Sequence, residues 1–262
     1  MKAREYLIYL ALKFSGDQRK ILDSISEKKD EYHDEELPPI KSEVLTILDD
    51  DYPEEFKRYP MPPLVLFYKG DISLIKNSKN NLAVIGTRRP TSYGLFATDK
   101  IIKEVGNGVV IVSGLAKGID RCAHELALRY GNKTIAVLGC GVNVCYPKSN
   151  QDVYDEIAKK GLIISEYPDL TPPSPEHFPL RNRLITLFSE ALLITQAYAR
   201  SGTSITANWA LDQNKTVLCV PHSINKYSLC NDLIQTGASL VTSGQDVLEW
   251  MGLNKEEPIF EN

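Results

Sequence analysis

Glycines, hydroxyl residues and cations gather after short apolar runs of this sequence, and together they have the chemistry to hold a phosphate-bearing ligand. Backbone amides at a glycine turn approach an anion closely, and a guanidinium forks around phosphate oxygens. The residues of this kind, which we predict to bind phosphate, are Gly86, Thr87, Arg88, Ser113, Gly114, Lys117, Lys148, Arg181, Arg183, Ser201, Gly202 and Thr203.

Two turns carry much of this signal. Residues 86–88 follow an expected strand and precede an expected helix, but they lack the glycine spacing of a dinucleotide fingerprint. A tight turn with Arg88 paired to a surface carboxylate is the alternative interpretation. Residues 113–118 form the second turn, and Asp120 after it is interpreted as a capping residue rather than a catalyst.

Two further segments begin expected helices. Arg181 and Arg183 are two positions apart, so their side chains diverge on a helix. We predict that one faces the ligand and the other pairs with an internal carboxylate such as Glu166. Residues 201–203 form either an anion site or a plain N-cap, and the sequence leaves both open.

We predict no catalytic residue, no metal site and no cofactor. Ser113 is not in a GxSxG motif, and the four histidines lack metal-ligand spacing. His124, alone on its expected helix, is interpreted as a packed residue. Tyr146 and Lys148 offer base stacking and backbone charge instead.

The elements that must position these residues alternate between strand and helix. Helices are expected over residues 94–105, 119–130, 151–160 and 205–213, and strands over 64–68, 82–86, 109–113, 134–138, 162–165, 191–195, 216–220 and 240–242. This alternation predicts an α/β fold with a doubly wound, mainly parallel sheet. Ligands of such sheets bind beyond the carboxyl ends of the strands.

The chain divides into three expected segments. Residues 1–60 form a small helical module and a proline-rich linker, with a second short helix over 42–48 capped by Ser42. Residues 61–250 form the main domain, and residues 251–262 form an acidic tail.

Charge and cysteine content narrow the function class. The net charge is −4, but residues 61–243 carry 19 basic and 14 acidic side chains, which is compatible with a polyanionic ligand. No apolar run is long enough to span a bilayer, and no secretory signal is recognisable. Five cysteines without a CxxC pair indicate free thiols in a reducing cytoplasm.

Ordered motifs between residues 45 and 248 resemble the DprA/Smf family of bacterial DNA-processing proteins. They are residues 83–88, 111–120, 123–124, 146–147, 178–183, 201–207 and 231–238. The resemblance implies an extended Rossmann-like domain behind a small helical (SAM-like) module. It also implies a non-enzymatic homodimer that binds single-stranded DNA and loads the RecA recombinase during natural transformation.

The resemblance also implies particular roles. The family's basic pocket corresponds to Gly86, Arg88, Ser113, Gly114, Lys148, Arg181 and Arg183. Its dimer and RecA-facing surface corresponds to residues 231–240, with Leu233, Ile234 and Leu240 as candidates.

Three positions depart from the family pattern. Gln196 stands where a glutamate is usual, and His222 and Leu229 stand where glycines are usual. Gln196 makes the crevice less acidic. The alternative function is a nucleotide-acting enzyme of the Rossmann-like phosphoribohydrolase type, but the glutamate that such an enzyme needs after residues 201–203 is absent.

Overall fold

The computed structural model describes residues 2–27, 39–198, 201–224 and 227–253. Within these ranges a nine-stranded sheet runs in the order β1-β2-β6-β5-β4-β3-β7-β8-β9. The strands are β1 (Glu43–Thr46), β2 (Val65–Gly70), β3 (Asn81–Gly86), β4 (Val110–Ser113), β5 (Thr134–Val137), β6 (Leu162–Ser165), β7 (Ala191–Gln196), β8 (Thr216–Cys219) and β9 (Ser239–Leu240).

The strands from β6 to β9 are parallel, and β1 and β2 extend the sheet antiparallel at one edge. The chain fills β3, β4, β5 and β6 in one direction and then returns to place β7 on the other side of β3. The predicted doubly wound, mainly parallel sheet is therefore confirmed. The point where the strand order reverses, between β3 and β7, is where such sheets bind ligands.

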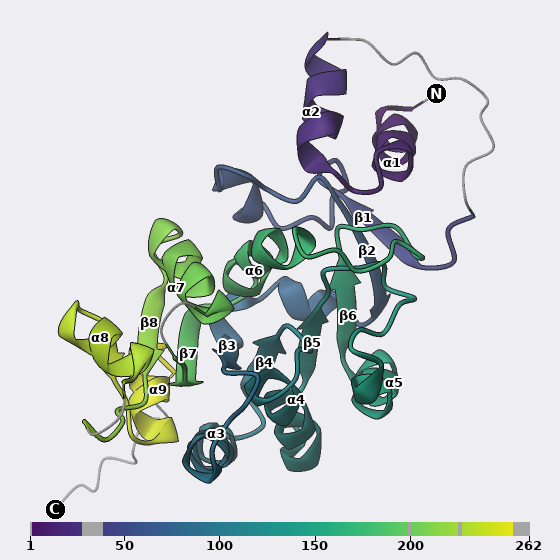
Figure 1. Ribbon diagram of the computed structural model, residues 1–262. Coiled ribbons are helices and arrows are strands. Elements are labelled where there is room, and N and C mark those ends of the chain that lie inside the picture. The colour runs from purple at the N-terminus through teal and green to yellow at the C-terminus, as the bar shows by residue number, and fades with distance from the viewer. Residues whose placement is uncertain (1, 28–38, 199–200, 225–226, 254–262) are drawn as a thin grey trace, which may run out of the picture.

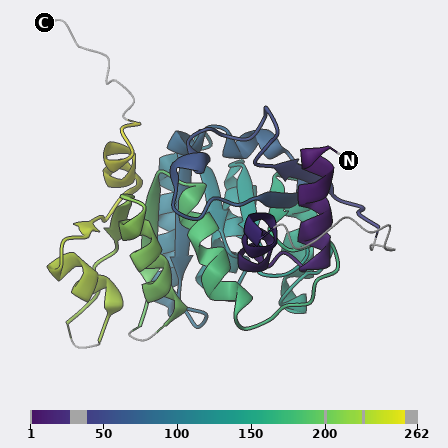
Figure 2. The same ribbon diagram turned by 90° about the horizontal axis from the view of Figure 1, so that it is seen from above.

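Helices cover both faces of the sheet (Figures 1 and 2). One face carries α3 (Ser92–Val105), α4 (Ile119–Tyr130), α5 (Gln151–Lys160) and α9 (Gly244–Trp250). The other carries α6 (His177–Leu187), α7 (Gly202–Asp212) and α8 (Leu229–Gln235). The helices α1 (Ala3–Lys13) and α2 (Gln18–Glu27) lie at the end formed by β1 and β2. Short 3-10 helices are η1 (Phe56–Arg58), η2 (Ile72–Ile75), η3 (Ser78–Asn80) and η4 (Lys148–Asn150).

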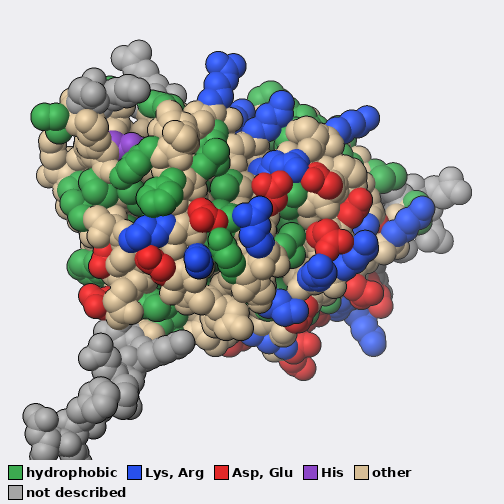
Figure 3. All heavy atoms as spheres, turned by 90° about the horizontal axis from the view of Figure 1, so that it is seen from below, with side chains coloured by type: hydrophobic (Ala, Val, Ile, Leu, Met, Phe, Trp, Pro, Cys, Tyr) green, Lys and Arg blue, Asp and Glu red, His purple; other side chains and the backbone are tan. Residues whose placement is uncertain are grey.

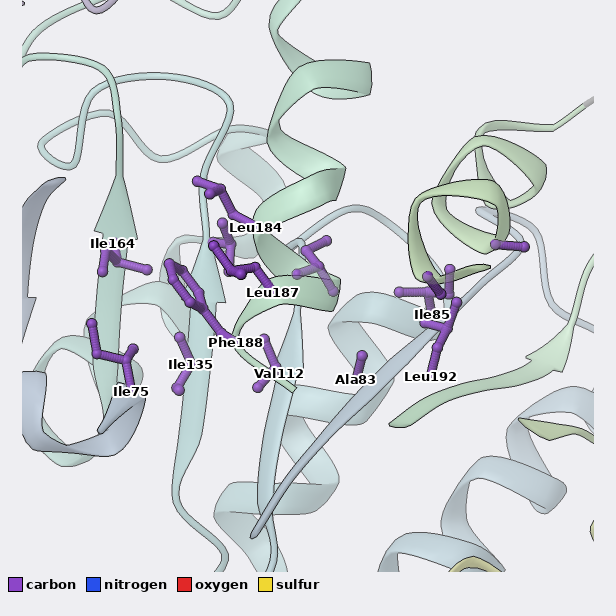
Figure 4. Packing of buried hydrophobic residues seen from close by; sticks show 14 of the residues in the cluster. Ile75, Ala83, Ile85, Val112, Ile135, Ile164, Leu184, Leu187, Phe188 and Leu192 are labelled. Carbon is purple, nitrogen blue, oxygen red and sulfur yellow. The ribbon is translucent and has the colours of Figure 1, made fainter. Parts of the chain in front are cut away.

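Alternation along each strand explains why the apolar runs are continuous. On β3, Leu82 packs toward α3 and α4, whereas the next residue, Ala83, packs toward α6. Both faces are buried, so residues 82–85 of the strand are all apolar. Figure 4 shows the α6 side of this core, where Phe188 lies beside Ile135 of β5.

One predicted element is wrong. Residues 42–48 were expected to form a helix capped by Ser42, but residues 43–46 form β1, in which Leu45 pairs with Leu66 of β2. The Ser42 hydroxyl and amide bind the Asp169 carboxylate instead, the amide over 3.1 Å. The backbone partners come from a strand distant in sequence, so local propensity misleads here.

β1 thus belongs to the sheet, although the proposed N-terminal segment reached residue 60; the three segment boundaries remain a prediction. Residues 254–262 of the expected acidic tail lie outside the described residues. All five cysteines are free thiols. Within the described ranges, no helix combines the length and the apolar character that crossing a membrane requires.

Candidate nucleic-acid interface

The turns after β3 and β4 touch at the carboxyl edge of the sheet. The Ile119 amide donates to the Thr87 carbonyl over 3.2 Å, and the Thr87 amide donates to the Gln196 carbonyl over 2.7 Å. Gly118 has φ +80°, and a Cβ there would lie 2.3 Å from the Thr87 carbonyl oxygen. Only glycine fits this contact. The ends of β3, β4 and β7 therefore form one continuous surface.

Two hydroxyls that were predicted to bind phosphate form hydrogen bonds inside the protein. Ser113 is buried, and its hydroxyl donates to the Val84 carbonyl over 2.7 Å. Thr87 is also buried, and its hydroxyl accepts from the Arg89 amide over 3.2 Å. Their role in ligand binding stays a prediction, and the structure gives each of them a part in shaping its turn.

Buried charges support the turn after β4 from below. Arg181 of α6 is 5% exposed, and its guanidinium donates to the carbonyls of Val137 and, over 2.7 Å, Gly114. The Asp120 carboxylate accepts from the Gly114 amide over 3.2 Å. Burial raises the pKa of Asp120, and the nearby charge of Arg181 opposes this shift. Asp120 therefore orients the turn.

Arg183 lies deeper in the protein and faces the N-terminal helices. Its guanidinium pairs with Glu166 at 2.5 Å, and both side chains are buried. The same nitrogen, Nη2, donates to Gln18 of α2 over 2.6 Å. The predicted pairing of one of the two arginines with Glu166 is confirmed, and Arg183 is the one that makes it.

His124 is packed, as predicted. Its ring is fully buried, with Nδ1 2.7 Å from the Thr134 hydroxyl. Burial and then the charge of Arg181 lower the pKa of His124 to about 3, so the ring is neutral near pH 7. Among the residues that the structure describes, no group of histidine, cysteine or acidic side chains could hold a metal ion.

Three of the predicted cations are exposed and available to a ligand. Arg88, Lys117 and Lys148 reach solvent, and none of them forms an ion pair within the described part of the chain. Asn150 donates to the Leu115 carbonyl over 2.9 Å, which holds η4 against the turn after β4. Lys117 and Lys148 are thereby brought onto neighbouring loops of the same sheet edge.

An aromatic pair begins on the loop that carries Lys148. Tyr146, immediately before the Pro147–Lys148 step, is 48% exposed and stacks on Phe178 of α6 with ring centroids 5.5 Å apart. Phe178 in turn packs against Gly139, just beyond the end of β5. The predicted site did not include Phe178, because its contact with Tyr146 joins the start of α6 to a loop that is distant in the sequence.

Residues 201–203 begin α7 beyond the carboxyl end of β7. The Ser201 carbonyl accepts from both the amide and the hydroxyl of Ser204, over 3.1 and 2.8 Å. Thr203 is buried. Among the described residues no hydrogen bond joins this turn to the Arg88 turn. The two turns share an edge of the sheet because β3 and β7 are parallel neighbours.

The predicted dimer and RecA-facing residues lie at the other end of the sheet. Leu233 and Ile234 of α8 are half-buried against the core, whereas Leu240 is 51% exposed on the edge strand β9. The loop before α8 also exposes Ile224 and Tyr227. This end therefore presents apolar side chains next to an unpaired strand edge.

Comparison with known proteins agrees with this architecture. Residues 43–252 match the family of DNA recombination-mediator protein A. The chain is 44% identical to DNA processing protein DprA of Streptococcus pneumoniae over 205 residues, which cover 78% of this chain and 72% of that protein. It is 40% identical to protein Smf of Synechocystis over 80% of this chain, but spans only 54% of that protein.

Two solved structures are similar along most of their length. The X-ray structure of DprA from Streptococcus pneumoniae has a TM-score of 0.75 at 39% identity and covers 88% of this chain and 80% of that one. A structure of DNA processing protein A from Helicobacter pylori, which describes its single-stranded DNA binding mode, has a TM-score of 0.72 at 34% identity and covers 80% of this chain and 95% of that one. The chain belongs to the DNA recombination-mediator protein A family.

Proposed function

We propose that this chain binds single-stranded DNA along the carboxyl edge of its sheet. One observation carries the proposal: Arg88, Lys117 and Lys148 come from three loops at the carboxyl edge of the sheet and are exposed without ion-pair partners among the described residues. The exposed Tyr146 ring lies on the same loop as Lys148. The Helicobacter pylori relative, described by its single-stranded DNA binding mode, supports the same ligand.

The arrangement favours a single strand over a duplex. Lysine and arginine side chains follow the phosphate backbone without reading sequence, and an exposed aromatic ring stacks on a base only when that base is unpaired. The buried partners, Arg181 and Asp120, would keep the turns rigid and thereby preorganise the exposed cations. We therefore propose binding with little sequence preference and a marked dependence on salt.

We further propose that the protein acts in the cytoplasm without enzymatic activity, as a homodimer that loads RecA on incoming single-stranded DNA during natural transformation. The exposed apolar residues Ile224, Tyr227 and Leu240 at the β9 end support a protein-binding surface there. That end of the sheet is several strands away from the cations, so the protein has room to bind DNA and a protein partner at the same time.

The test of DNA binding compares two double variants by fluorescence anisotropy with a labelled thymidine oligomer. Arg88→Ala/Lys148→Ala removes two phosphate contacts, and we expect at least tenfold weaker binding. The slope of log K against log salt should also become shallower by about 1.4, since each contact contributes about 0.7. Lys79→Ala/Lys133→Ala is the matched control, because both lysines are exposed just before β3 and β5, at the opposite edge of the sheet.

Equal affinity of the two double variants would refute this assignment of the site. The absence of enzymatic activity needs a separate assay, in which the protein is incubated with nucleoside monophosphates and free base is measured by chromatography. Sustained release of base would show a phosphoribohydrolase instead.

A further inference from the structure

A groove on the face of the sheet that carries α3 and α4 continues from the proposed DNA site. It lies between α3 and α4 and has a volume of about 550 Å³. Its lining residues come from the turns after β3 and β4, from α3 and from α4: Pro90, Leu95, Phe96, Asp99, Gly118, Arg121, Cys122, Glu125, Leu126 and Arg129. A volume of this order suits a small organic group such as a base with its sugar.

One end of the groove is formed by the turns after β3 and β4, which carry Arg88 and Lys117. Pro90 follows Arg88 by two residues, and Gly118 follows Lys117 directly. Gly118 also packs against the Thr87–Arg88 backbone, so both turns border the groove. A strand whose phosphates meet Arg88 and Lys117 therefore has the groove within reach of its next nucleotide.

The chemistry of the groove suits an uncharged ring better than a phosphate. Phe96 is 63% exposed and Leu95 is 41% exposed, so an aromatic and an aliphatic side chain face solvent there. The two carboxylates are already bonded: Asp99 accepts from the Tyr130 hydroxyl over 2.9 Å, and Glu125 pairs with Arg121 at 2.8 Å. They keep free lone pairs that can accept hydrogen bonds from the N–H groups of bases.

Charge on this side of the molecule fits the same interpretation. Figure 3 shows the side on which α3, α4 and α5 lie, and basic and acidic side chains are mixed there among apolar ones rather than forming one basic field. The groove lining itself contains two arginines and two acidic residues. Phosphates would gain little there, whereas the apolar floor would bind a base.

We propose that the groove between α3 and α4 binds a nucleobase of the same single strand, with Phe96 as its stacking surface. The proposal rests on the proposed function and adds a second base-binding position, separate from Tyr146. Continuity with the Arg88 and Lys117 turns favours a nucleotide over a peptide from a protein partner.

The test uses two oligomers of equal length, one of thymidine and one with a sugar-phosphate backbone that lacks bases. Phe96→Ala should weaken binding of the thymidine oligomer about fivefold or more, since a stacked base contributes about 1 kcal/mol or more. It should leave binding of the oligomer without bases unchanged, and Phe96→Trp should restore the affinity. Because Phe96 is largely exposed, its removal should not unfold the protein.

Leu48→Ala, an exposed apolar change beyond β1, is the matched control and should alter neither affinity. If Phe96→Ala binds both oligomers as the unaltered protein does, the groove does not hold a base, and a peptide partner becomes its better occupant. If Phe96→Ala weakens both oligomers equally, stacking is also refuted. Failure of the proposed function is distinct, because then Arg88→Ala/Lys148→Ala would leave the affinity for both oligomers unchanged.

Discussion

Glu166→Gln should destabilise the protein strongly and leave its DNA site intact. The change removes the charge that compensates Arg183, whose side chain is 4% exposed and whose partner is 9% exposed. It keeps nearly the same volume and one carbonyl oxygen as an acceptor. What remains is a buried guanidinium whose only other acceptor among the described residues is Gln18, at 2.6 Å.

The size of the expected stability loss follows from the burial of this ion pair. Breaking a buried ion pair by removing one partner costs about 3–5 kcal/mol. Gln18 and the introduced amide oxygen both still accept from Arg183, so we expect the lower end, a decrease of about 3 kcal/mol in the free energy of unfolding. For a chain of this size that corresponds to a Tm about 6–12 °C lower.

Urea unfolding followed by circular dichroism measures the change. The control is Glu156→Gln, which breaks an exposed pair with Lys160 and should change stability little. Adding Arg183→Met to Glu166→Gln removes both charges and should recover most of the loss. If Glu166→Gln is as stable as Glu156→Gln, the charge of Glu166 is not needed to compensate the buried charge of Arg183.

The same double variant tests the role of Arg183. With both charges removed and the fold retained, affinity for single-stranded DNA should match that of the unaltered protein, because Arg183 faces α2 and not the exposed cations. A clear loss of affinity in folded protein would return Arg183 to the set of ligand contacts.

Two further perturbations test the turn and the buried histidine. Gly118→Ala places a methyl group 2.3 Å from the Thr87 carbonyl oxygen. The control is Gly131→Ala, because Gly131 has the same φ of +80° but open space around it, and urea unfolding should show a larger loss of stability for Gly118→Ala. Equal losses for the two variants would mean that the contact with Thr87 is unimportant. Lowering the pH from 7.5 to 5.5 should reduce the free energy of unfolding by about 1.4 kcal/mol through His124. The pKa of His124 is about 3 in the folded protein and 6.5 in the unfolded chain, so only the unfolded chain gains the proton. His124→Gln should lack this part of the pH dependence, and a pH profile identical to that of the unaltered protein would contradict the prediction.

The sheet could be predicted because its central strands are buried on both faces. Such strands need apolar side chains on both faces, so runs such as residues 82–85 stand out from helices without any knowledge of their partners. Residues 43–46 could not be assigned in this way. They form a strand through pairing with β2, a contact that depends on the whole chain and leaves only a weak local pattern.

The candidate site was predicted in outline, since the carboxyl ends of parallel strands must share an edge. Which side chains face solvent there could not be predicted, because spacing on a helix gives direction but not burial. Arg181 and Arg183 diverge as expected, and both are nonetheless buried. Phe96 had a signal that the prediction did not use: it is a large apolar residue outside the buried stripe of α3, which runs through Ala97 and Ile101.

Strong sequence motifs in this chain mark the scaffold of the site more than its contact surface. A buried arginine must meet carbonyl or carboxylate acceptors at fixed positions, so Arg181 and Arg183 are bound to a tightly specified context that includes Gly114 and Glu166. An exposed cation that meets a phosphate needs only its charge, so Lys148 leaves a weaker pattern. It follows that changes in Arg181 and Arg183 should lower stability first and affinity only as a consequence. Changes in the exposed residues should lower affinity alone, and measuring both quantities on each variant separates the two groups.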